Sequence, residues 1–214
     1  NFVAPPGITV VFGRSGAGKT TVINAVAGLI NPTSGHISLD DTVLFDSVAG
    51  INVPVHDRQF GYVFQDGRLF PHMSVRENLT FGQRFNAARD NGPSLADVCD
   101  LLGITSLLDR RIGALSGGEK QRIAIGRALL SHPRMLLMDE PLASLDSARK
   151  TEILPYLERL RDHTNIPILY VSHSMTEVAR LATTIVVLEN GGIARAGSAE
   201  QVLSDPDMVR QLGV

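Results

Sequence analysis

The sequence predicts an α/β fold in which a mainly parallel core sheet carries an antiparallel β portion and a helical subdomain. Three observations lead to this prediction. Short continuous apolar runs recur along the chain, as expected of parallel strands that are buried on both faces. These runs alternate with stretches of helical spacing, the order that is typical of an α/β sheet. From Pro71 to about Leu130 the pattern is mainly helical, which predicts an insertion in the middle of the chain.

The first strand is predicted at Gly7–Phe12, where the sequence is GITVVF. A glycine-rich turn leads from it into a helix at about Lys19–Leu29, which Asn31-Pro32 would close. Residues from about Gly35 to Asp46 are predicted to form an antiparallel hairpin around Asp40-Asp41.

Further along, breaks in the helical stretch are expected at Gly92-Pro93 and near Gly113. A helix follows at Ser147–Arg161, and Asn190-Gly191 predicts a tight turn. The other apolar runs are predicted as strands, at Phe60–Phe64, Met135–Met138, Ile166–Val171 and Thr184–Leu188.

The length of 214 residues suits one domain with a substantial core. Within it, residues 1–70 and 131–214 are predicted to form the core with its antiparallel portion, and about 71–130 the helical subdomain. The chain opens with Asn1 and enters a strand almost at once, so we expect a fragment whose natural start is missing.

The composition is that of an ordinary globular protein, with 43% hydrophobic and 20% charged residues and a net charge of −2. This charge offers no broad basic surface, so we expect no nucleic-acid partner. The single Cys99 excludes an intrachain disulfide, suits a reducing compartment and is expected to be a small buried side chain. No apolar run approaches the ~18–20 residues that cross a bilayer, and no signal peptide opens the chain. Any membrane role is therefore expected to come through a partner.

A phosphate-binding loop is predicted between the first strand and the first helix. It fits the pattern G-x-x-x-x-G-K-[ST] with Gly13, Arg14, Ser15, Gly16, Ala17, Gly18, Lys19 and Thr20. The glycines let backbone N–H groups point at an anion, and the start of the helix adds its positive dipole end. Lys19 would contact the β- and γ-phosphates of a nucleotide, and the Thr20 hydroxyl would bind Mg²⁺. The structural alternative is a glycine turn with a solvated lysine.

Two other glycine motifs do not fit this loop. A dinucleotide fingerprint would need a third glycine at the position of Thr21. A nucleophile elbow around Ser15 would need a glycine at the position of Ala17. The nucleotide-binding set is therefore predicted to run from Gly13 through Thr21.

Two carboxylates follow the strand predicted at Met135–Met138, where open α/β sheets bind their ligands. Asp139 can hold Mg²⁺, usually through water, beside Thr20. Glu140 can then orient or deprotonate the attacking water. The structural alternative is that Asp-Glu-Pro only ends a strand and begins a helix.

A second anion site is predicted at a helix start. Ser116 and Glu119 form a capping box, which is the structural explanation and is expected to hold as well. It does not explain Gly117 and Gly118, because glycines weaken the first turn of a helix. Glycines there suit the approach of a phosphate. Because one nucleotide needs only one such site, this one is expected to serve a neighbouring molecule's ATP.

The order of these motifs resembles that of the ABC ATPases, P-loop NTPases of ABC transporters, over essentially the whole chain. The set comprises the phosphate loop, Gln65 after a strand, Leu115–Glu119, Asp139-Glu140, Ser144-Leu145-Asp146 and His173. The resemblance implies ATP and Mg²⁺ as cofactors and a head-to-tail dimer of two copies. Each ATP would lie between one copy's phosphate loop and the other copy's serine-glycine-glycine segment.

The resemblance also implies roles for further residues. Gln65 would contact Mg²⁺ or the attacking water and sense a membrane subunit, and His173 would contact the γ-phosphate. Ser144, Leu145 and Asp146 would lie in a loop that crosses the dimer interface. Asp146 could equally be a helix N-cap, and a histidine after a strand can be merely structural.

The finer match is to the ATPase subunit of bacterial molybdate importers. It rests on GYVFQDGRLFPH, EKQRIAIGRALL, DEPLASLD, EILPYLERLR with its unusual Pro155, and ILYVSHS. This resemblance implies integral membrane permease subunits, indirectly a periplasmic substrate-binding protein, and a place on the cytoplasmic face of the inner membrane. Sulfate, iron and polyamine importers have similar ATPases and remain alternatives, as do a soluble non-transport ABC ATPase and a binding module without turnover.

The chain departs from the family pattern in two places. We expect the strands that carry the family's adenine-stacking aromatic before the phosphate loop to lie outside this sequence, and Phe2 is not assigned that role. Molybdate importers usually carry a small oxyanion-binding β domain after the ATPase, and we expect none within this sequence, which ends at Val214.

Overall fold

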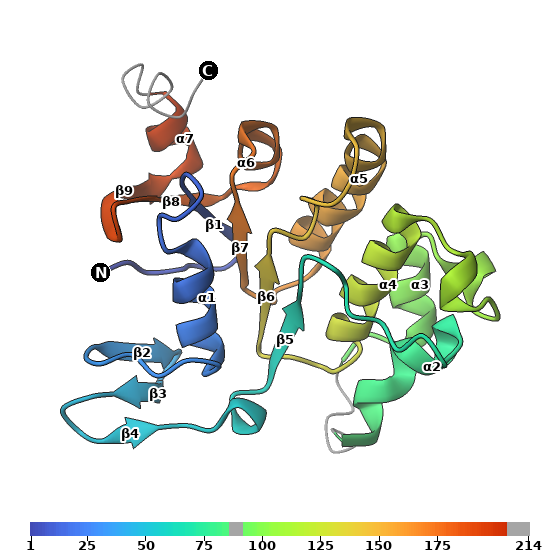
Figure 1. The fold of residues 1–214 in the computed structure, drawn as a ribbon, viewed down its shortest axis with the longest axis horizontal. Coiled ribbons are helices and arrows are strands. Elements are labelled where there is room, and N and C mark those ends of the chain that lie inside the picture. The colour runs from blue at the N-terminus through green and yellow to red at the C-terminus, as the bar shows by residue number, and fades with distance from the viewer. Residues whose placement is uncertain (86–91, 205–214) are drawn as a thin grey trace.

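The structure, a computed structural model, describes residues 1–85 and 92–204 and is built around a six-stranded sheet (Figure 1). Its strands are β1 (Ile8–Phe12), β5 (Phe60–Val63), β6 (Met135–Asp139), β7 (Ile168–Ser172), β8 (Thr184–Glu189) and β9 (Gly192–Ser198). They lie in the order β5-β6-β7-β1-β8-β9, and every neighbouring pair except β8 and β9 is parallel. The predicted α/β fold with a mainly parallel core sheet is confirmed.

Helices cover both faces of this sheet. They are α1 (Lys19–Ala27), α2 (Val75–Thr80), α3 (Leu95–Leu102), α4 (Gly117–Leu129), α5 (Ser147–His163), α6 (Met175–Leu181) and α7 (Ala199–Leu203). Successive strand residues point to opposite faces, so Val10 packs in the layer of α4, α5 and α6, and Val11 packs in the layer of α1. The fully buried pattern of β1, β7 and most of β6 explains why these strands are continuous apolar runs. In the two described ranges, none of the helices has both the length and the apolar character needed to cross a membrane.

A second, antiparallel sheet lies beside α1 and consists of β2 (His36–Leu39), β3 (Thr42–Asp46) and β4 (Ile51–Asn52). The predicted hairpin around Asp40-Asp41 is confirmed, and Asp40 takes the left-handed conformation (φ 50°) that such turns require. The two-residue strand β4 was not predicted, because both of its residues are exposed and give no alternation.

The middle of the chain is helical, as predicted. Capping boxes begin α2, α3 and α4 at Ser74, Ser94 and Ser116. The break at Gly92-Pro93 precedes α3, and a short 3-10 helix, η4, contains Gly113. Residues 86–91 of the predicted helical stretch lie outside the described residues. Four 3-10 helices complete the described elements: η1 (Val55–Asp57), η2 (Phe81–Phe85), η3 (Thr105–Leu107) and η4 (Ile112–Ala114), with η2 continuing α2.

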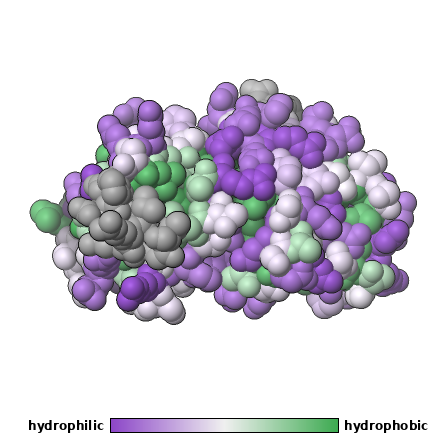
Figure 2. Space-filling view, turned by 90° about the horizontal axis from the view of Figure 1, so that it is seen from above, coloured by the Kyte–Doolittle hydropathy of each residue, from purple (hydrophilic) through white to green (hydrophobic). Residues whose placement is uncertain are grey.

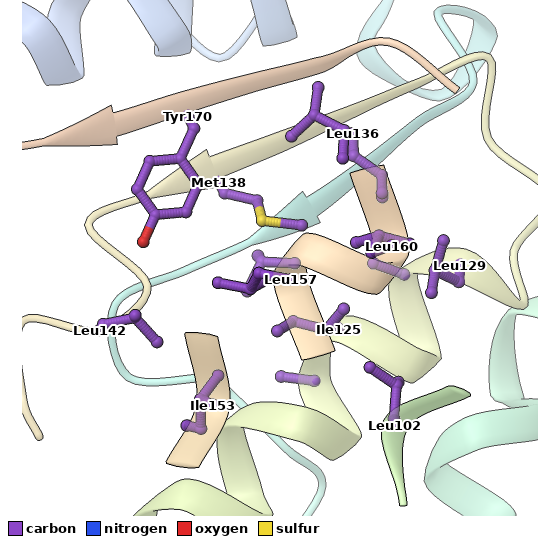
Figure 3. Close-up of a cluster of buried hydrophobic side chains, with 14 of the residues drawn as sticks. Leu102, Ile125, Leu129, Leu136, Met138, Leu142, Ile153, Leu157, Leu160 and Tyr170 are labelled. Carbon is purple, nitrogen blue, oxygen red and sulfur yellow. The ribbon is translucent and has the colours of Figure 1, made fainter. Parts of the chain in front are cut away.

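One large apolar cluster joins the helical region to the sheet. Figure 3 shows Leu102 of α3 and Ile125 and Leu129 of α4 facing α5 and the strand residues Leu136 and Met138. Because α4 packs on both α5 and the neighbouring helices, the division of the chain near residues 71 and 130 remains a prediction.

Several boundaries differ from the predicted ones for physical reasons. Helix α1 ends at Ala27 rather than Leu29, because Gly28 adopts the left-handed conformation (φ 79°) and its N–H caps the helix. Helix α5 continues to His163 with Pro155 inside it. The Asn190-Gly191 turn is confirmed by φ angles of 49° and 78°, and it leads into β9, which was not predicted.

Candidate functional site

The glycine-rich loop of residues 13–18 connects β1 to α1 at the carboxyl edge of the sheet (Figure 1). Gly16 and Gly18 have φ angles of 83° and 97°, which non-glycine residues rarely adopt. Added Cβ atoms at Gly16 would meet nothing within 4 Å, whereas at Gly13 one would lie 2.5 Å from the Leu188 carbonyl oxygen. The left-handed turns at Gly16 and Gly18 and the close backbone contact at Gly13 therefore explain the glycines.

Lys19 lies under this loop and is only 5% exposed. Its Nζ donates hydrogen bonds to the carbonyl oxygens of Gly13 (2.9 Å) and Arg14 (3.1 Å). The same Nζ is 3.5 Å from Oε1 of Glu140. A buried ammonium group is thus held at the centre of the loop, where it can attract phosphate oxygens.

The acidic end of β6 meets the start of α1. Thr20 Oγ1 donates a hydrogen bond of 3.2 Å to Oδ1 of Asp139. Burial raises the pKa of Asp139, and the neighbouring Glu140 carboxylate adds to this rise, while the Thr20 hydrogen bond opposes it. Next to this pair, burial and then the charge of Asp139 raise the pKa of Tyr62, whose hydroxyl donates to Asn24 Oδ1 at 2.8 Å.

Glu140 joins the phosphate loop to His173. Its two carboxylate oxygens face different partners, Oε1 toward Lys19 and Oε2 toward Nδ1 of His173 at 3.2 Å. Its backbone has a φ of 45°, a conformation that costs a non-glycine residue about 1–3 kcal/mol and is often found at functional sites. The backbone N–H of Glu140 donates to the Val171 carbonyl at 3.1 Å, which helps to hold this conformation.

Gln65 lies just past the end of β5, beside the end of β6, since Val63 pairs with Met138. Its side chain is exposed. The structure therefore places it at the same sheet edge as Asp139 and Glu140. Figure 2 views this edge from above and shows hydrophilic residues gathered across the middle of the molecule.

The segment Ser116–Glu119 begins α4 and is not brought together with the phosphate loop. Figure 1 shows α4 toward one end of the molecule's long axis and α1 toward the other. Glu119 N donates to Ser116 Oγ (3.2 Å), and Ser116 N donates to Glu119 Oε2 (2.7 Å), so the capping box is confirmed. The backbone N–H of Ser116 lowers the pKa of Glu119.

Local packing explains only one of the two glycines in this segment. A Cβ at Gly117 would lie 3.0 Å from Leu145 Cδ2, which is tighter than ordinary contact. At Gly118 the nearest atom would be Ile153 Cδ1 at 3.6 Å, an ordinary van der Waals distance. The short distance between Gly117 and Leu145 also shows that the Ser116 segment packs on the loop of Ser144, Leu145 and Asp146.

Asp146 is the N-cap of α5, because its Oδ1 accepts from Arg149 N at 2.9 Å. This cap confirms one of the two interpretations of Asp146. Ser144 and Asp146 are exposed and Leu145 is buried. Phe2 is partly buried and packs against the cluster that includes Ala17 and Val11, which gives it a role in packing.

Arg127 of α4 fixes the loop that follows β5, a role that was not predicted from the sequence. Its guanidinium donates to the carbonyl oxygens of Gly67 and Arg68, both at 2.9 Å, and lies 5.1 Å from the centroid of the Phe70 ring. Arg68 has a left-handed backbone (φ 44°) that this contact helps to hold. Nothing in the sequence signals that this arginine binds carbonyl groups of a loop about 60 residues away in the chain.

A buried lysine under a glycine loop, with a threonine beside a strand-end aspartate, is characteristic of P-loop nucleotide-binding proteins. The sequence matches the ABC transporter family over residues 3–143. The chain belongs to this family.

Similar proteins give a finer comparison. The "Molybdenum import ATP-binding protein ModC" of Rhizobium johnstonii is 58% identical over 205 residues, covering 96% of this chain and 58% of that protein. The protein of the same name from Rhodospirillum rubrum is 58% identical over 207 residues, covering 97% and 56%. The chain thus spans less than two thirds of the length of these relatives.

A solved structure supports the fold. The structure of cbiO1 from Clostridium perfringens, part of the ABC transporter complex cbiONQ, matches with a TM-score of 0.77 at 27% sequence identity. The match covers 96% of this chain and 82% of that one.

Proposed function

We propose that this chain binds ATP with Mg²⁺ and hydrolyses it as the ATP-binding subunit of a bacterial importer whose cargo is molybdate. One observation carries the enzymatic part of this proposal: the Glu140 carboxylate lies between Lys19 of the phosphate loop and His173. The cargo is supported by the 58% identity to proteins named for molybdenum import.

The nucleotide phosphates would lie in the loop of residues 13–18 and at the start of α1. Backbone N–H groups there and the helix dipole favour negative charge. Lys19 would bind the β- and γ-phosphates, exchanging part of its contact with the Gly13 and Arg14 carbonyls for phosphate oxygens. Thr20 and Thr21 would add donors at the first turn of α1.

The donor set at the strand end fits Mg²⁺. Thr20 Oγ1 and Asp139 Oδ1 are hard oxygen ligands 3.2 Å apart, and Gln65 lies on the adjoining strand end. A Mg²⁺ ion bound between protein and phosphates needs few protein ligands. When bound, Mg²⁺ neutralises phosphate charge and orients the γ-phosphate.

Glu140 would orient and deprotonate the water that attacks the γ-phosphate. Its carboxylate is partly buried and directed by Lys19 on one side and His173 on the other, which limits its rotation. His173, whose side chain is 54% exposed, would donate to the γ-phosphate as negative charge develops there. A donor at this position stabilises the transition state more than the ground state, because the negative charge it faces grows as the reaction proceeds.

A second copy of the chain would complete the site. Ser116, Gly117, Gly118 and the N-terminal turn of α4 would face the nucleotide held by the partner's phosphate loop. In the capping boxes of Ser74 and Ser94 the hydroxyl donates to the box's own carboxylate. Within the described residues, the Ser116 hydroxyl makes no such donation, so its hydrogen is available to a phosphate oxygen.

The pair would dock on integral membrane permease subunits at the cytoplasmic face of the inner membrane and receive cargo indirectly from a periplasmic substrate-binding protein. Closure of the two copies around ATP would move the loop that follows Gln65. Arg127 connects this loop to α4, so that motion at either place would reach the other.

The test is reconstitution of the protein with its permease in lipid vesicles that contain a molybdate receptor. Phosphate release and molybdate uptake are expected to depend on each other and on ATP. Sulfate, ferric iron and polyamine receptors serve as cargo controls. Uptake of one of these in place of molybdate would overturn the cargo, and absence of phosphate release would overturn the enzymatic proposal.

A further inference from the structure

A buried carboxylate on α6 lies behind the proposed catalytic residues. Glu177 is only 3% exposed, and three side chains contact its carboxylate. Oε2 accepts hydrogen bonds from the hydroxyls of Tyr170 (2.9 Å) and Ser172 (2.8 Å), and Oε1 accepts one from Lys150 Nζ (3.1 Å). A carboxylate this deeply buried needs such partners, because an unpaired charge there would be costly.

Tyr170 provides a rigid part of this arrangement. Figure 3 shows its ring beside Met138 in the buried cluster. Burial, and then the charge of Glu177, raise the pKa of Tyr170 well above its usual value, so the hydroxyl remains a donor. Glu177 is therefore anchored to the fully buried strand β7.

The carboxylate contact with Ser172 and a backbone hydrogen bond of Glu177 fix the chain on both sides of His173. Ser172 precedes this histidine, and its Oγ both donates to Glu177 and accepts from Ser174 N at 3.0 Å. Ser174 follows the histidine, and its Oγ accepts from Glu177 N at 3.5 Å. The exposed His173 ring thus lies on a short turn between Ser172 and Ser174, and both of these serines are hydrogen-bonded to Glu177.

The third contact reaches α5. Lys150 lies one helical turn after the N-cap Asp146, and its backbone N donates to the Asp146 carbonyl at 3.0 Å. The Lys150–Glu177 ion pair therefore joins the His173 turn to the start of α5, which carries the predicted dimer loop.

We propose that Glu177 is a positioning residue for hydrolysis: it holds His173 beside Glu140 and fixes the His173 turn to the helix that begins at Asp146. This inference rests on the proposed function. A purely structural role would predict that losing Glu177 contacts lowers stability and affects every property of the protein alike. A positioning role predicts an effect that passes through His173.

The first variant is Glu177→Gln. Its amide oxygen can still accept from Tyr170 and Ser172, but its NH₂ group would face the Lys150 ammonium, donor against donor. We expect kcat for ATP to fall about tenfold, since small misplacements of catalytic groups have effects of this order or larger, while KM changes less than about twofold. Adding Lys150→Gln, which permits an amide–amide hydrogen bond, is expected to restore part of kcat.

The second measurement places Glu177→Gln in a His173→Ala background. If Glu177 acts through His173, kcat is expected to fall no further in this background. The ring resonances of His173, followed by NMR, are expected to shift in Glu177→Gln and to return toward the wild-type position in the double variant with Lys150→Gln. This signal does not depend on turnover.

Glu158→Gln is the matched control. It removes another ion pair between α5 and α6, in which Glu158 Oε1 lies 2.7 Å from Arg180 Nε, and is expected to leave kcat and the His173 resonances unchanged. Unchanged His173 resonances in Glu177→Gln, or an equal loss of kcat with and without His173, would overturn the inference. If the wild type itself does not hydrolyse ATP, the proposed function fails, and the His173 resonances alone decide the positioning role.

Discussion

The Thr20 hydroxyl donates a hydrogen bond to Asp139 at 3.2 Å, although 119 positions separate the two residues in the chain. This contact exists because β6 and β1 both end at the same edge of the parallel sheet, with only β7 between them. It brings the glycine loop and the acidic strand end next to each other. The proposal that a single magnesium nucleotide occupies both places depends on this arrangement.

The role of Glu140 as the base can be tested with Glu140→Gln. The amide keeps the shape of the side chain but cannot take a proton, so kcat for ATP is expected to fall by about 100-fold or more. ATP binding is expected to persist, and a nucleotide-bound dimer should accumulate and be visible in gel filtration with ATP.

Glu152→Gln, an exposed glutamate on α5, is the control and should turn over like the wild type. Hydrolysis by Glu140→Gln at the wild-type rate would show that another group activates the water.

Arg127→Met should loosen the loop of residues 64–70. The change removes the two hydrogen bonds from the guanidinium to the Gly67 and Arg68 carbonyls and is expected to cost about 1–3 kcal/mol of the free energy of unfolding. Arg127→Lys should retain only part of this free energy, because an ammonium group cannot donate to both carbonyls in the fork geometry of a guanidinium. Urea unfolding and hydrogen exchange of the loop amides measure these effects.

Arg122→Met is the control on the same helix, since Arg122 donates instead to the carbonyls of Leu102 and Gly103. It should leave exchange at residues 64–70 as it is in the wild type. Equal loop exchange in Arg127→Met and wild type would contradict the assignment of Arg127.

Gly28 and Arg58 form a tight structural pair at the end of α1. The Arg58 guanidinium is buried and donates to the carbonyls of Ala25, Val26 and Val53, while a Cβ at Gly28 would lie 2.7 Å from its Cζ. Gly28→Ala is therefore expected to cost about 1–3 kcal/mol through overpacking, in addition to the backbone cost. Urea unfolding provides the measurement.

Gly50→Ala isolates the backbone term. Gly50 also has a positive φ (67°), but a Cβ there would meet nothing within 4 Å. We expect a smaller loss of stability for Gly50→Ala than for Gly28→Ala. Equal losses would mean that the contact with Arg58 contributes nothing.

The capping box of α4 should make stability depend on pH. The folded-state pKa of Glu119 lies below its usual value of 4.5, chiefly because Ser116 N donates to its carboxylate. A group of this kind stabilises the fold above the unfolded-state pKa, and this contribution is lost as pH falls through the lower folded-state pKa. The wild type should exceed Glu119→Gln by about 0.5 kcal/mol at pH 7.

This difference should shrink as pH falls from about 5 toward 3, because only the wild-type residue titrates there. Urea unfolding of both proteins across this range measures it. A difference that stays constant with pH would argue against the Ser116–Glu119 hydrogen bond as its cause.

Most of the fold could be predicted because buried parallel strands are continuous apolar runs. The β1, β6, β7 and β8 runs were all found in this way, whereas the loop that Gly13 and Lys19 define was found from its glycine–lysine motif. The strand β9 was not predicted, because its largely exposed sequence Gly192–Ser198 lacks apolar alternation. It forms because the Asn190-Gly191 turn directs the chain back along β8, with which it pairs.

The site was only partly predictable for a different reason. Thr20, Asp139 and Glu140 belong to local motifs whose spacing is visible in the sequence. Arg127 and Glu177 do not, because their partners are carbonyl oxygens of a distant loop and a lysine on another helix. Such contacts depend on how the elements pack, and no periodicity or motif records them.

The central claim is that the loop around Lys19 binds the phosphates of ATP. Its most direct test is a calorimetric titration with ATP, with and without Mg²⁺, of the wild type and of Lys19→Ala. We expect saturable binding that Mg²⁺ strengthens and that Lys19→Ala weakens about 30-fold or more, since losing a buried charged partner costs about 2 kcal/mol or more. ATP that does not bind the wild type, or that binds Lys19→Ala equally well, would contradict a phosphate site at this loop.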